Sequence, residues 1–280
     1  MIASNLLNTI NRFVPRPSHP FNLNNDGIAT YSQWQYQKGE DTIRNYLNAA
    51  TKEEMFKDKV VIDLGCGAAG KSLYYATLGA EMVYGVEILQ KYEAPAKELA
   101  ETLGLSDKFT FVHADGANLP FESNTIDSII INDAMEHVDE PEAVLKECLR
   151  VLKPKGRIYV NFPPYFHPHG AHLSDAIGIP WVHMFFSEKT LINSYKSLVK
   201  PLPDGKERLA FRISTNDAGE EYFSYINKMT VSRFKRILKN ENLKAIYYNE
   251  IPLRGFFTPL AKTPVLKEMF IKMVVCVIEK

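Results

Sequence analysis

Apolar segments and helical segments alternate regularly between residues 59 and 162, and this alternation limits the possible folds more than any other feature of the sequence. Five short apolar runs are predicted as strands, at 59–64, 82–88, 109–113, 126–132 and 157–162. Helices are predicted between them at 71–78, 90–103 and 140–152. Because strands joined through helices run parallel and are covered on both faces, the pattern predicts an α/β fold.

The segments outside this alternation complete the predicted fold. A helix at 231–240 and strands at 243–250 and 270–278 extend the sheet, which predicts a doubly wound, Rossmann-like, seven-stranded and mostly parallel sheet. Short helices are expected at 3–12 and 38–50. We therefore divide the chain into an N-terminal arm with lid helices (1–57), an α/β core (58–162), a cap or substrate insertion (163–229) and a C-terminal completion of the sheet (230–280).

Charge and cysteine content exclude several classes of protein. The chain has 33 basic and 33 acidic residues, which argues against a wholly basic nucleic-acid binder. Three widely spaced cysteines favour neither a disulfide framework nor a zinc site. No apolar run approaches the ~20 residues of a membrane helix, and the first residues do not resemble a secretory signal. We expect a soluble, cytoplasmic protein without a transmembrane segment; its oligomeric state stays open.

The glycine-rich segment after the first strand allows two interpretations. Residues 65–72, GCGAAGKS, satisfy the phosphate-loop pattern GxxxxGK[ST]. Asp133 follows the apolar strand 126–132 and could bind a magnesium ion. Under this interpretation the protein is an NTPase, with Lys71 on the β- and γ-phosphates.

The second interpretation is a turn that binds a nucleoside without phosphates. Asp63 lies at the end of the strand, and Gly65 and Gly67 let the backbone approach a ligand closely. Glu87, roughly 20 residues on, is placed to accept both hydroxyls of a ribose. Asp115 follows the third strand and could accept a hydrogen bond from an adenine amino group. The phosphate-loop interpretation explains none of these three carboxylates.

Five motifs support the second interpretation further. They are VVIDLGCGAAGKS (60–72), VYGVEI (83–88), HADGANLPF (113–121), DSIIINDAMEHV (127–138) and LRVLKPKGRIYV (149–160). In this order and spacing, over residues 58–162, the chain resembles the class I S-adenosylmethionine-dependent methyltransferases, most of all their quinone-biosynthesis-type small-molecule subgroup. One position departs from the family pattern: Ala69 stands where a third glycine is common, and Gly70 follows it.

The resemblance implies S-adenosyl-L-methionine as cofactor and a role for each matched residue. Asp63, Gly65 and Gly67 would hold the methionine end, with Cys66 between the glycines. Glu87 would bind the ribose and Ile88 would pack on adenine. Asp115, Gly116 and Ala117 would meet the adenine edge, and Asn132 would face the transferring methyl group. Other roles stay open: Glu87 as a solvated carboxylate, Asp115 as a turn residue, and Tyr31, Trp34 and Tyr36 as either a cover over the cofactor or core residues. Lys71 is expected to be exposed.

The insertion is rich in histidine and proline. Three interpretations remain: a cap whose histidines bond locally, a substrate pocket with a histidine base, or a metal site that includes Asp175. The 167-169-172 spacing of the histidines is not a familiar zinc pattern, so no metal is predicted. The candidate bases are His169, His172 and His183.

Together these features predict transfer of a methyl group to an O, N or C atom of a small-molecule or lipid-like acceptor. The alternatives are the phosphate-loop NTPase at Gly65–Ser72 and a non-catalytic cofactor-binding module. Nucleic acid is not expected as the acceptor, because the sequence Asn161-Phe162-Pro163-Pro164-Tyr165 follows the fifth strand, whereas nucleic-acid amino methylators carry such a motif after the fourth.

Overall fold

The computed structural model describes residues 2–17, 19–23, 30–263 and 266–280, and its chain divides into two compact units. The first, which we call the insertion unit, comprises residues 1–22, 163–230 and 252–272. The second, the sheet unit, comprises residues 23–162, 231–251 and 273–280. Residues of the predicted N-terminal arm are found in both, since 1–22 belong to the insertion unit and 23–57 to the sheet unit.

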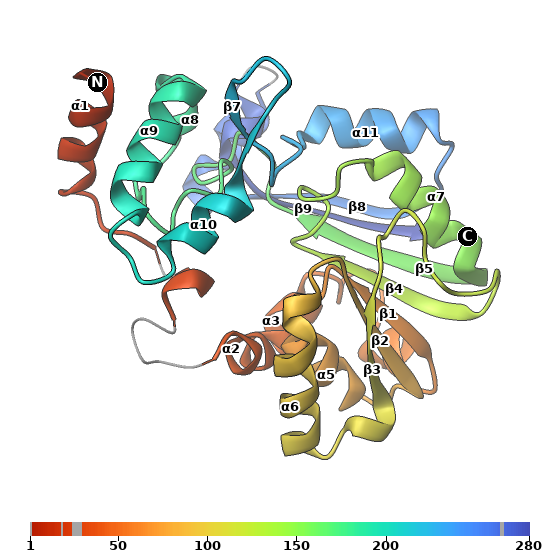
Figure 1. The fold of residues 1–280 in the computed structure, drawn as a ribbon. Coiled ribbons are helices and arrows are strands. Elements are labelled where there is room, and N and C mark those ends of the chain that lie inside the picture. The colour runs from red at the N-terminus through yellow and green to blue at the C-terminus, as the bar shows by residue number, and fades with distance from the viewer. Residues whose placement is uncertain (1, 18, 24–29, 264–265) are drawn as a thin grey trace. The chain divides into compact units, whose positions relative to one another are not determined.

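The sheet unit is built on a seven-stranded sheet, drawn in Figure 1. Its strands are β1 (Val60–Leu64), β2 (Met82–Glu87), β3 (Phe109–His113), β4 (Ile126–Asn132), β5 (Leu152–Phe162), β8 (Ala245–Pro252) and β9 (Ile271–Glu279). Their order across the sheet is β3-β2-β1-β4-β5-β9-β8. Strands β1 to β5 pair in parallel, and β9 pairs antiparallel to β5. The predicted doubly wound, mostly parallel sheet is therefore confirmed.

Helices cover both faces of this sheet. In Figure 1, α5 (Gly70–Ala76) and α6 (Glu93–Leu103) lie along one face, and α7 (Pro141–Val151) and α11 (Val231–Asn240) along the other. Three further helices precede the sheet: α2 (Tyr31–Gln37), α3 (Gly39–Arg44) and α4 (Lys52–Phe56). Strands β1 and β4, in the middle of the sheet, are almost wholly buried, as the near-continuous apolar run of β4 requires.

Several boundaries differ from the predicted ones. The expected helix at 38–50 is only the six-residue α3, and α2 and α4 were not predicted. Both unpredicted helices are short and begin with capping boxes, at Thr30 and Thr51. Strand β5 begins at Leu152 rather than at 157, because a register shift against β4 accommodates the turn at Lys155, whose φ is +67°.

The insertion unit contains more regular structure than the sequence suggested. Its elements are α1 (Ile2–Asn11), α8 (Val182–Phe185), α9 (Glu188–Val199), α10 (Gly205–Arg212), α12 (Thr258–Ala261) and a hairpin of β6 (Ile213–Thr215) and β7 (Glu221–Phe223). Short 3₁₀ turns occur in both units, at Pro20–Asn22, Gln90–Tyr92, Ser106–Lys108, Gly255–Phe257 and Lys267–Phe270. The insertion unit has a hydrophobic core of its own, in which Leu7, Leu191 and Tyr195 are buried.

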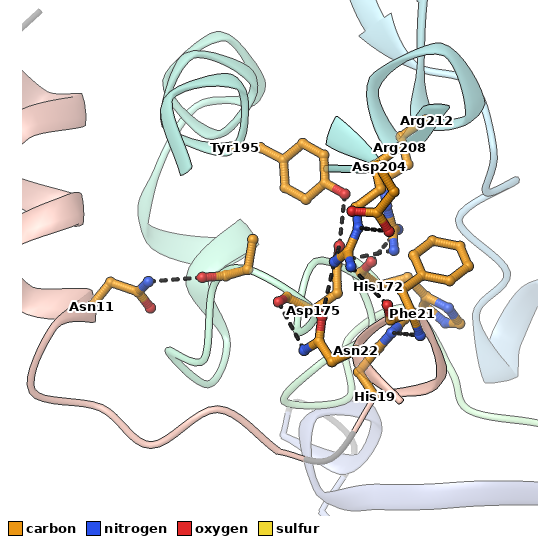
Figure 2. A network of polar contacts seen from close by, with 11 residues as sticks. Asn11, His19, Phe21, Asn22, His172, Asp175, Tyr195, Asp204, Arg208 and Arg212 are labelled. Atoms are coloured by element: carbon orange, nitrogen blue, oxygen red, sulfur yellow. Dashed lines mark hydrogen bonds and ion pairs between the residues drawn. The ribbon is translucent and has the colours of Figure 1, made fainter. Parts of the chain in front are cut away.

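A buried ionic cluster joins distant segments of the insertion unit (Figure 2). The Asp175 carboxylate accepts hydrogen bonds from Arg208 Nη1 at 3.1 Å, Arg212 Nη2 at 3.0 Å and the Tyr195 hydroxyl at 2.8 Å. Arg208 also donates to the side chain of Asn22 at 2.9 Å. Since both guanidinium groups and the carboxylate are almost fully buried, their pairing compensates charges that would be costly alone.

Both oxygens of Asp175 therefore pair with guanidinium groups, whereas the metal interpretation of the insertion used this carboxylate as a metal ligand.

Among the described residues, no helix is both long enough and apolar enough to cross a bilayer.

Candidate functional site at the carboxyl edge of the sheet

The glycine turn between β1 and α5 forms the floor of the candidate site. Gly65 and Gly67 have φ values of +76° and +55°, which favour glycine. A Cβ atom at Gly65 would lie 2.6 Å from the Cβ of Ala134, so the turn passes close to the segment that follows β4. This close approach brings the carboxyl ends of β1 and β4 together.

Asp63 lies beneath the turn and is buried. Its Oδ2 accepts a 2.6 Å hydrogen bond from the Ser72 hydroxyl, which is also fully buried. Desolvation raises the pKa of Asp63 to about 6, although the hydrogen bond from Ser72 and the nearby Lys71 act in the opposite direction. A cationic group entering the site would favour the ionised form of Asp63, whereas an anionic group would be repelled by it.

Glu87, the last residue of β2, is bound to the same turn. Its Oε2 accepts a hydrogen bond from the Gly67 N–H at 2.9 Å, and its Oε1 accepts one from the Leu89 N–H at 3.0 Å. These bonds fix the carboxylate while leaving lone pairs on both oxygens. Burial raises its pKa, opposed by the same backbone bonds. The next side chain, Ile88, is 60% exposed, which makes it an apolar surface at the edge of the site.

Asp115 and its neighbours follow β3. The Asp115 side chain accepts a hydrogen bond from the Ala117 N–H at 2.9 Å, so it forms a local turn and is exposed. A Cβ atom at Gly116 would lie 3.2 Å from the side chain of Leu64 in β1. The turn after β3 is thus held close to β1, at the same edge as Glu87.

The end of β4 adds polar groups to the same edge. Asn132 is buried and donates from Nδ2 to Asp133 Oδ2 at 3.0 Å. Lys71 Nζ lies 3.7 Å from that same oxygen. The expectation that Lys71 is exposed was wrong: its side chain is only 14% exposed, because it is directed toward Asp133. Glu136 is also buried, and desolvation, followed by the charge of Asp133, raises its pKa.

Helix α2 covers the glycine turn, through a residue that the sequence did not indicate. Gln35 donates from Nε2 to the Cys66 carbonyl at 3.1 Å and to the Tyr31 hydroxyl at 3.2 Å, and it accepts at Oε1 from the Gly70 N–H at 3.2 Å. Tyr31 and Gln35 lie four residues apart and therefore share one helix face. The four-residue spacing of Tyr31 and Gln35 was the one sequence signal for this contact. The same spacing is equally typical of side chains that face a protein core.

The three aromatic residues of α2 have different neighbours. The rings of Tyr31 and Trp34 stack with centroids 6.2 Å apart. The ring of Tyr36 instead meets Tyr74 of α5 edge-on, at 5.9 Å. Tyr31 is therefore the one that lies beside the glycine turn, since a Cβ atom at Gly67 would come within 3.2 Å of its ring.

The backbone of the turn argues against a phosphate loop. Phosphate binding needs N–H groups directed at the ligand. Here the N–H groups of Gly65 and Cys66 donate to the Val86 carbonyl, and that of Gly67 donates to Glu87. The Ala69 N–H donates to the Cys66 carbonyl and the Gly70 N–H to Gln35. The turn lies against a carboxylate instead of presenting its amides to an anion, so the NTPase interpretation is not favoured.

A cavity of about 390 Å³ lies beside the turn. It is bordered by α2, Ala68 and one side of α6, and its walls include Tyr31, Tyr92 and Leu99. None of Asp63, Glu87, Asp115 or Asn132 lines it. We therefore place the candidate site at the carboxyl edge of the sheet, where these polar side chains gather, and not in this cavity.

The predicted histidines belong to the insertion unit. The His169 N–H donates to His167 Nδ1 at 3.2 Å, and the His172 ring lies edge-on to Tyr225, with centroids 6.5 Å apart. The His183 ring lies 4.8 Å from the Tyr165 ring. Desolvation lowers the pKa of His169, and it lowers the pKa of His183 to about 4.

The fold and this site define an α/β domain whose parallel strands bring several carboxyl groups together at the carboxyl edge of the sheet. Comparison with known proteins gives the family. Residues 62–160 match the family model described as "Methyltransferase domain". Residues 62–160 therefore form a methyltransferase domain, of the kind that uses S-adenosylmethionine as its cofactor.

Relatives with named activities support this family. The chain is 30% identical over 164 residues to a sterol 4-C-methyltransferase of Caenorhabditis elegans, covering 54% of this chain and 48% of that protein. It is 36% identical over 100 residues to a demethylmenaquinone methyltransferase of Clavibacter sepedonicus, covering 36% of this chain and 39% of that protein. The chain therefore spans less than half the length of these two relatives.

The crystal structure of an S-adenosylmethionine-dependent methyltransferase from Aquifex aeolicus has the same fold. It aligns with a TM-score of 0.52 at 14% identity, over 94% of this chain and 99% of that one. At this identity the likeness concerns the fold alone.

Proposed function

We propose that the protein transfers a methyl group from S-adenosylmethionine to an O, N or C atom of a small-molecule or lipid-like acceptor. The observation that carries this proposal is the position of Glu87, whose carboxylate is fixed at the tip of β2 by the N–H groups of Gly67 and Leu89. A carboxylate held there can accept hydrogen bonds from both hydroxyls of a ribose. The same carboxylate would repel a polyphosphate.

The electrostatics of the edge support a cationic ligand. Four carboxyl groups, of Asp63, Glu87, Asp133 and Glu136, gather with one amine, that of Lys71. S-adenosylmethionine carries a sulfonium and an α-amino group, so its charge complements this set. Desolvation already makes ionisation of Asp63 costly, and a bound cation would offset that cost.

The residues proposed to bind the cofactor follow the order of the strands. The methionine end would lie against the β1 turn, the ribose against the end of β2 and the adenine against the turn after β3, while the methyl group would face the end of β4. The proposed set is Asp63, Gly65, Cys66 and Gly67 for the methionine end, Glu87 and Ile88 for the ribose and adenine face, Asp115, Gly116 and Ala117 for the adenine edge, and Asn132 near the methyl group.

We propose that the insertion unit binds the acceptor. An acceptor with a hydroxyl group needs a base, and His169, His172 and His183 are the candidates. A pKa of about 4 makes His183 a weak base near neutral pH in the arrangement described. The relatives act on sterol and demethylmenaquinone by name, which supports a lipid-like acceptor.

The reaction itself places modest demands on the protein. The cofactor supplies an electrophilic methyl group, and the protein has to hold a nucleophilic atom of the acceptor about 3 Å from it, opposite the sulfur. The bond from the nucleophile to the methyl carbon forms as the carbon–sulfur bond breaks, and the electron pair of that bond stays on sulfur. A base removes the proton of a hydroxyl acceptor.

We further propose a cytoplasmic location and no nucleic-acid partner, in keeping with the balanced charge of the chain.

Calorimetry with S-adenosylhomocysteine and, separately, with ATP and magnesium tests the cofactor. We expect binding of the first and none of the second. Glu87→Ala should weaken binding on the order of 100-fold, because two hydrogen bonds to a charged group are lost. Glu81→Ala, at an exposed residue just before the same strand, is the matched control and should leave the affinity unchanged.

Tight ATP binding, or equal affinities of the two glutamate variants, would overturn the proposed site. A screen of cell extract with labelled methyl donor then tests activity. If the protein binds the cofactor but labels no acceptor, the chain is a binding module and not an enzyme.

A further inference from the structure

Helix α1 is oriented against the usual pattern of a surface helix, which buries its apolar face. The side chains that it buries in the insertion unit are Ser4, Leu7 and Asn11, of which two are polar. The large apolar side chains that it exposes are Ile2 (88% exposed), Leu6 (55%), Ile10 (41%) and, just beyond its end, Phe13 (84%).

The exposed apolar residues form one continuous stripe. At about 100° per residue, positions 2, 6 and 10 fall within an arc of about 80°, and Phe13 follows in the turn beyond the helix. The buried positions 4, 7 and 11 lie on the opposite side. We call the four exposed residues Ile2, Leu6, Ile10 and Phe13 the α1 stripe.

The orientation of α1 is fixed by specific contacts. Asn11 donates from Nδ2 to the Ala176 carbonyl at 2.8 Å and accepts at Oδ1 from the Gly178 N–H at 2.9 Å. The Ser194 hydroxyl donates to the Ser4 carbonyl at 3.4 Å. Leu7 is fully buried in the core of the insertion unit. A rotation that buried the stripe would break the hydrogen bonds of Asn11, so the stripe is held outward.

The charged side chains nearest the stripe in the sequence have one sign. Residues 1–25 contain Arg12 and Arg16 and no acidic residue, and α1 itself carries no charged side chain. Arg12, which precedes Phe13, and Arg16, three residues after it, are both exposed. An apolar stripe with cations at one end is the composition of helices that lie in the interface of a bilayer containing anionic lipids.

We propose that the α1 stripe docks the protein on an anionic lipid surface, with α1 lying in the plane of the headgroups. The four apolar side chains enter the boundary between headgroups and acyl chains, and Arg12 and Arg16 contact lipid phosphates. A second copy of the chain fits less well, because the segment would bring its arginines together with no acidic residue of its own to pair them. The proposal is independent of methyl transfer.

Vesicle flotation tests this proposal without any activity measurement. The full chain is mixed with vesicles of phosphatidylcholine, with and without phosphatidylglycerol. We expect binding to the anionic vesicles, weakened by added salt, and weaker binding to the neutral ones. Leu6→Asp should reduce binding on the order of tenfold or more. Arg12→Gln combined with Arg16→Gln should remove the preference for anionic vesicles.

Matched controls separate the stripe from general effects. Asn5→Asp adds the same charge on the exposed flank of α1, outside the stripe, and should bind vesicles nearly as well as the unchanged protein. Ile2→Ser combined with Phe13→Ser changes the two most exposed members, so binding should fall while Tm stays constant.

Three results would overturn the proposal. One is absence of binding to anionic vesicles. Another is equal binding by Leu6→Asp and Asn5→Asp. The last is a concentration-dependent dimer that Leu6→Asp abolishes in the absence of lipid, which would assign the stripe to a second copy.

Discussion

Asp63 is a buried carboxyl group whose protonation is linked to folding. Its pKa of about 6 in the folded protein lies above the usual 3.8, so the folded state binds this proton more tightly than the unfolded state. The corresponding stabilisation, at most about 3 kcal/mol, is present at low pH and is lost as the pH rises through 6. Asp63→Asn removes this dependence.

We therefore expect the Tm of Asp63→Asn, minus that of the unchanged protein, to increase between about pH 4 and about pH 7. Thermal unfolding without cofactor measures it. Asp107→Asn, at an exposed carboxylate, should give a curve parallel to that of the unchanged protein. A constant difference for Asp63→Asn would contradict the raised pKa.

Gly70 explains why the glycine pattern is displaced by one residue. Ala69 has a φ of +57° and is fully buried, whereas a Cβ atom at Gly70 would lie 1.9 Å from the Ser32 carbonyl oxygen and 2.5 Å from the Tyr36 nitrogen. Backbone atoms of α2 occupy the space that a side chain would need. The close packing of α2 therefore requires glycine at position 70. The sequence alone did not predict this helix.

Gly70→Ala should destabilise the protein by about 2 kcal/mol or more, since overpacking against backbone cannot be relieved by a side-chain rotation. Gly255→Ala serves as control because a Cβ atom there would have open space, and it should change the free energy of unfolding by less than about 0.5 kcal/mol. Denaturant unfolding measures both. Similar values for the two variants would mean that α2 does not pack on the turn as described.

Among the elements, the strands were the most predictable. β3 and β4 have their predicted bounds, and β1, β2 and β9 differ by a residue at one or both ends. The β-branched, almost continuously apolar sequences of β1, β4 and β9 are typical of a sheet buried on both faces. Short helices were not predictable: α2 and α4 have seven and five residues, too few for a periodic pattern. α9, with twelve residues and a Ser187 cap, was overlooked in a segment that prolines and histidines made look irregular.

Some residues of the candidate site were likewise predictable from the local sequence, and others were not. Asp63, Glu87 and Asn132 are found at strand ends, where residue type and position were enough to propose them. Gln35 and Lys71 required tertiary structure, because each contacts a segment far away in the sequence. No local pattern distinguishes a glutamine that bonds a distant turn from one in solvent.

Helix α2 gives a prediction at this scale. Gln35→Ala removes three hydrogen bonds. It leaves the buried Gly70 N–H without its acceptor and the Cys66 carbonyl with the Ala69 N–H as its remaining donor. We expect about 1–3 kcal/mol of destabilisation and faster amide exchange in the turn. Gln37→Ala, exposed on the same helix, should change neither. Amide hydrogen exchange with mass spectrometry measures the opening of the turn in both variants. Unchanged exchange at residues 65–70 in Gln35→Ala would contradict the role of α2.

For the whole molecule, the ionic cluster around Asp175 should determine the stability of the insertion unit. Asp175→Asn leaves two buried guanidinium groups without their shared counter-charge, which typically costs about 3–5 kcal/mol. We expect faster amide exchange in 163–230, with little change in 60–132. Glu221→Gln, which breaks an exposed pair with Lys196, is the control and should have almost no effect. Uniform acceleration across both ranges would mean that the two units unfold together.

The strand order has a consequence for how the chain folds during synthesis. β9 lies between β5 and β8, although β8 is made earlier. A nascent chain that has released β1 to β5 can pair those strands while it is still attached to the ribosome. β8, however, has no neighbour in the sheet until β9 has emerged from the exit tunnel. We therefore expect the β5 edge to stay uncovered until β9 has left the exit tunnel, an interval in which a chaperone could bind it.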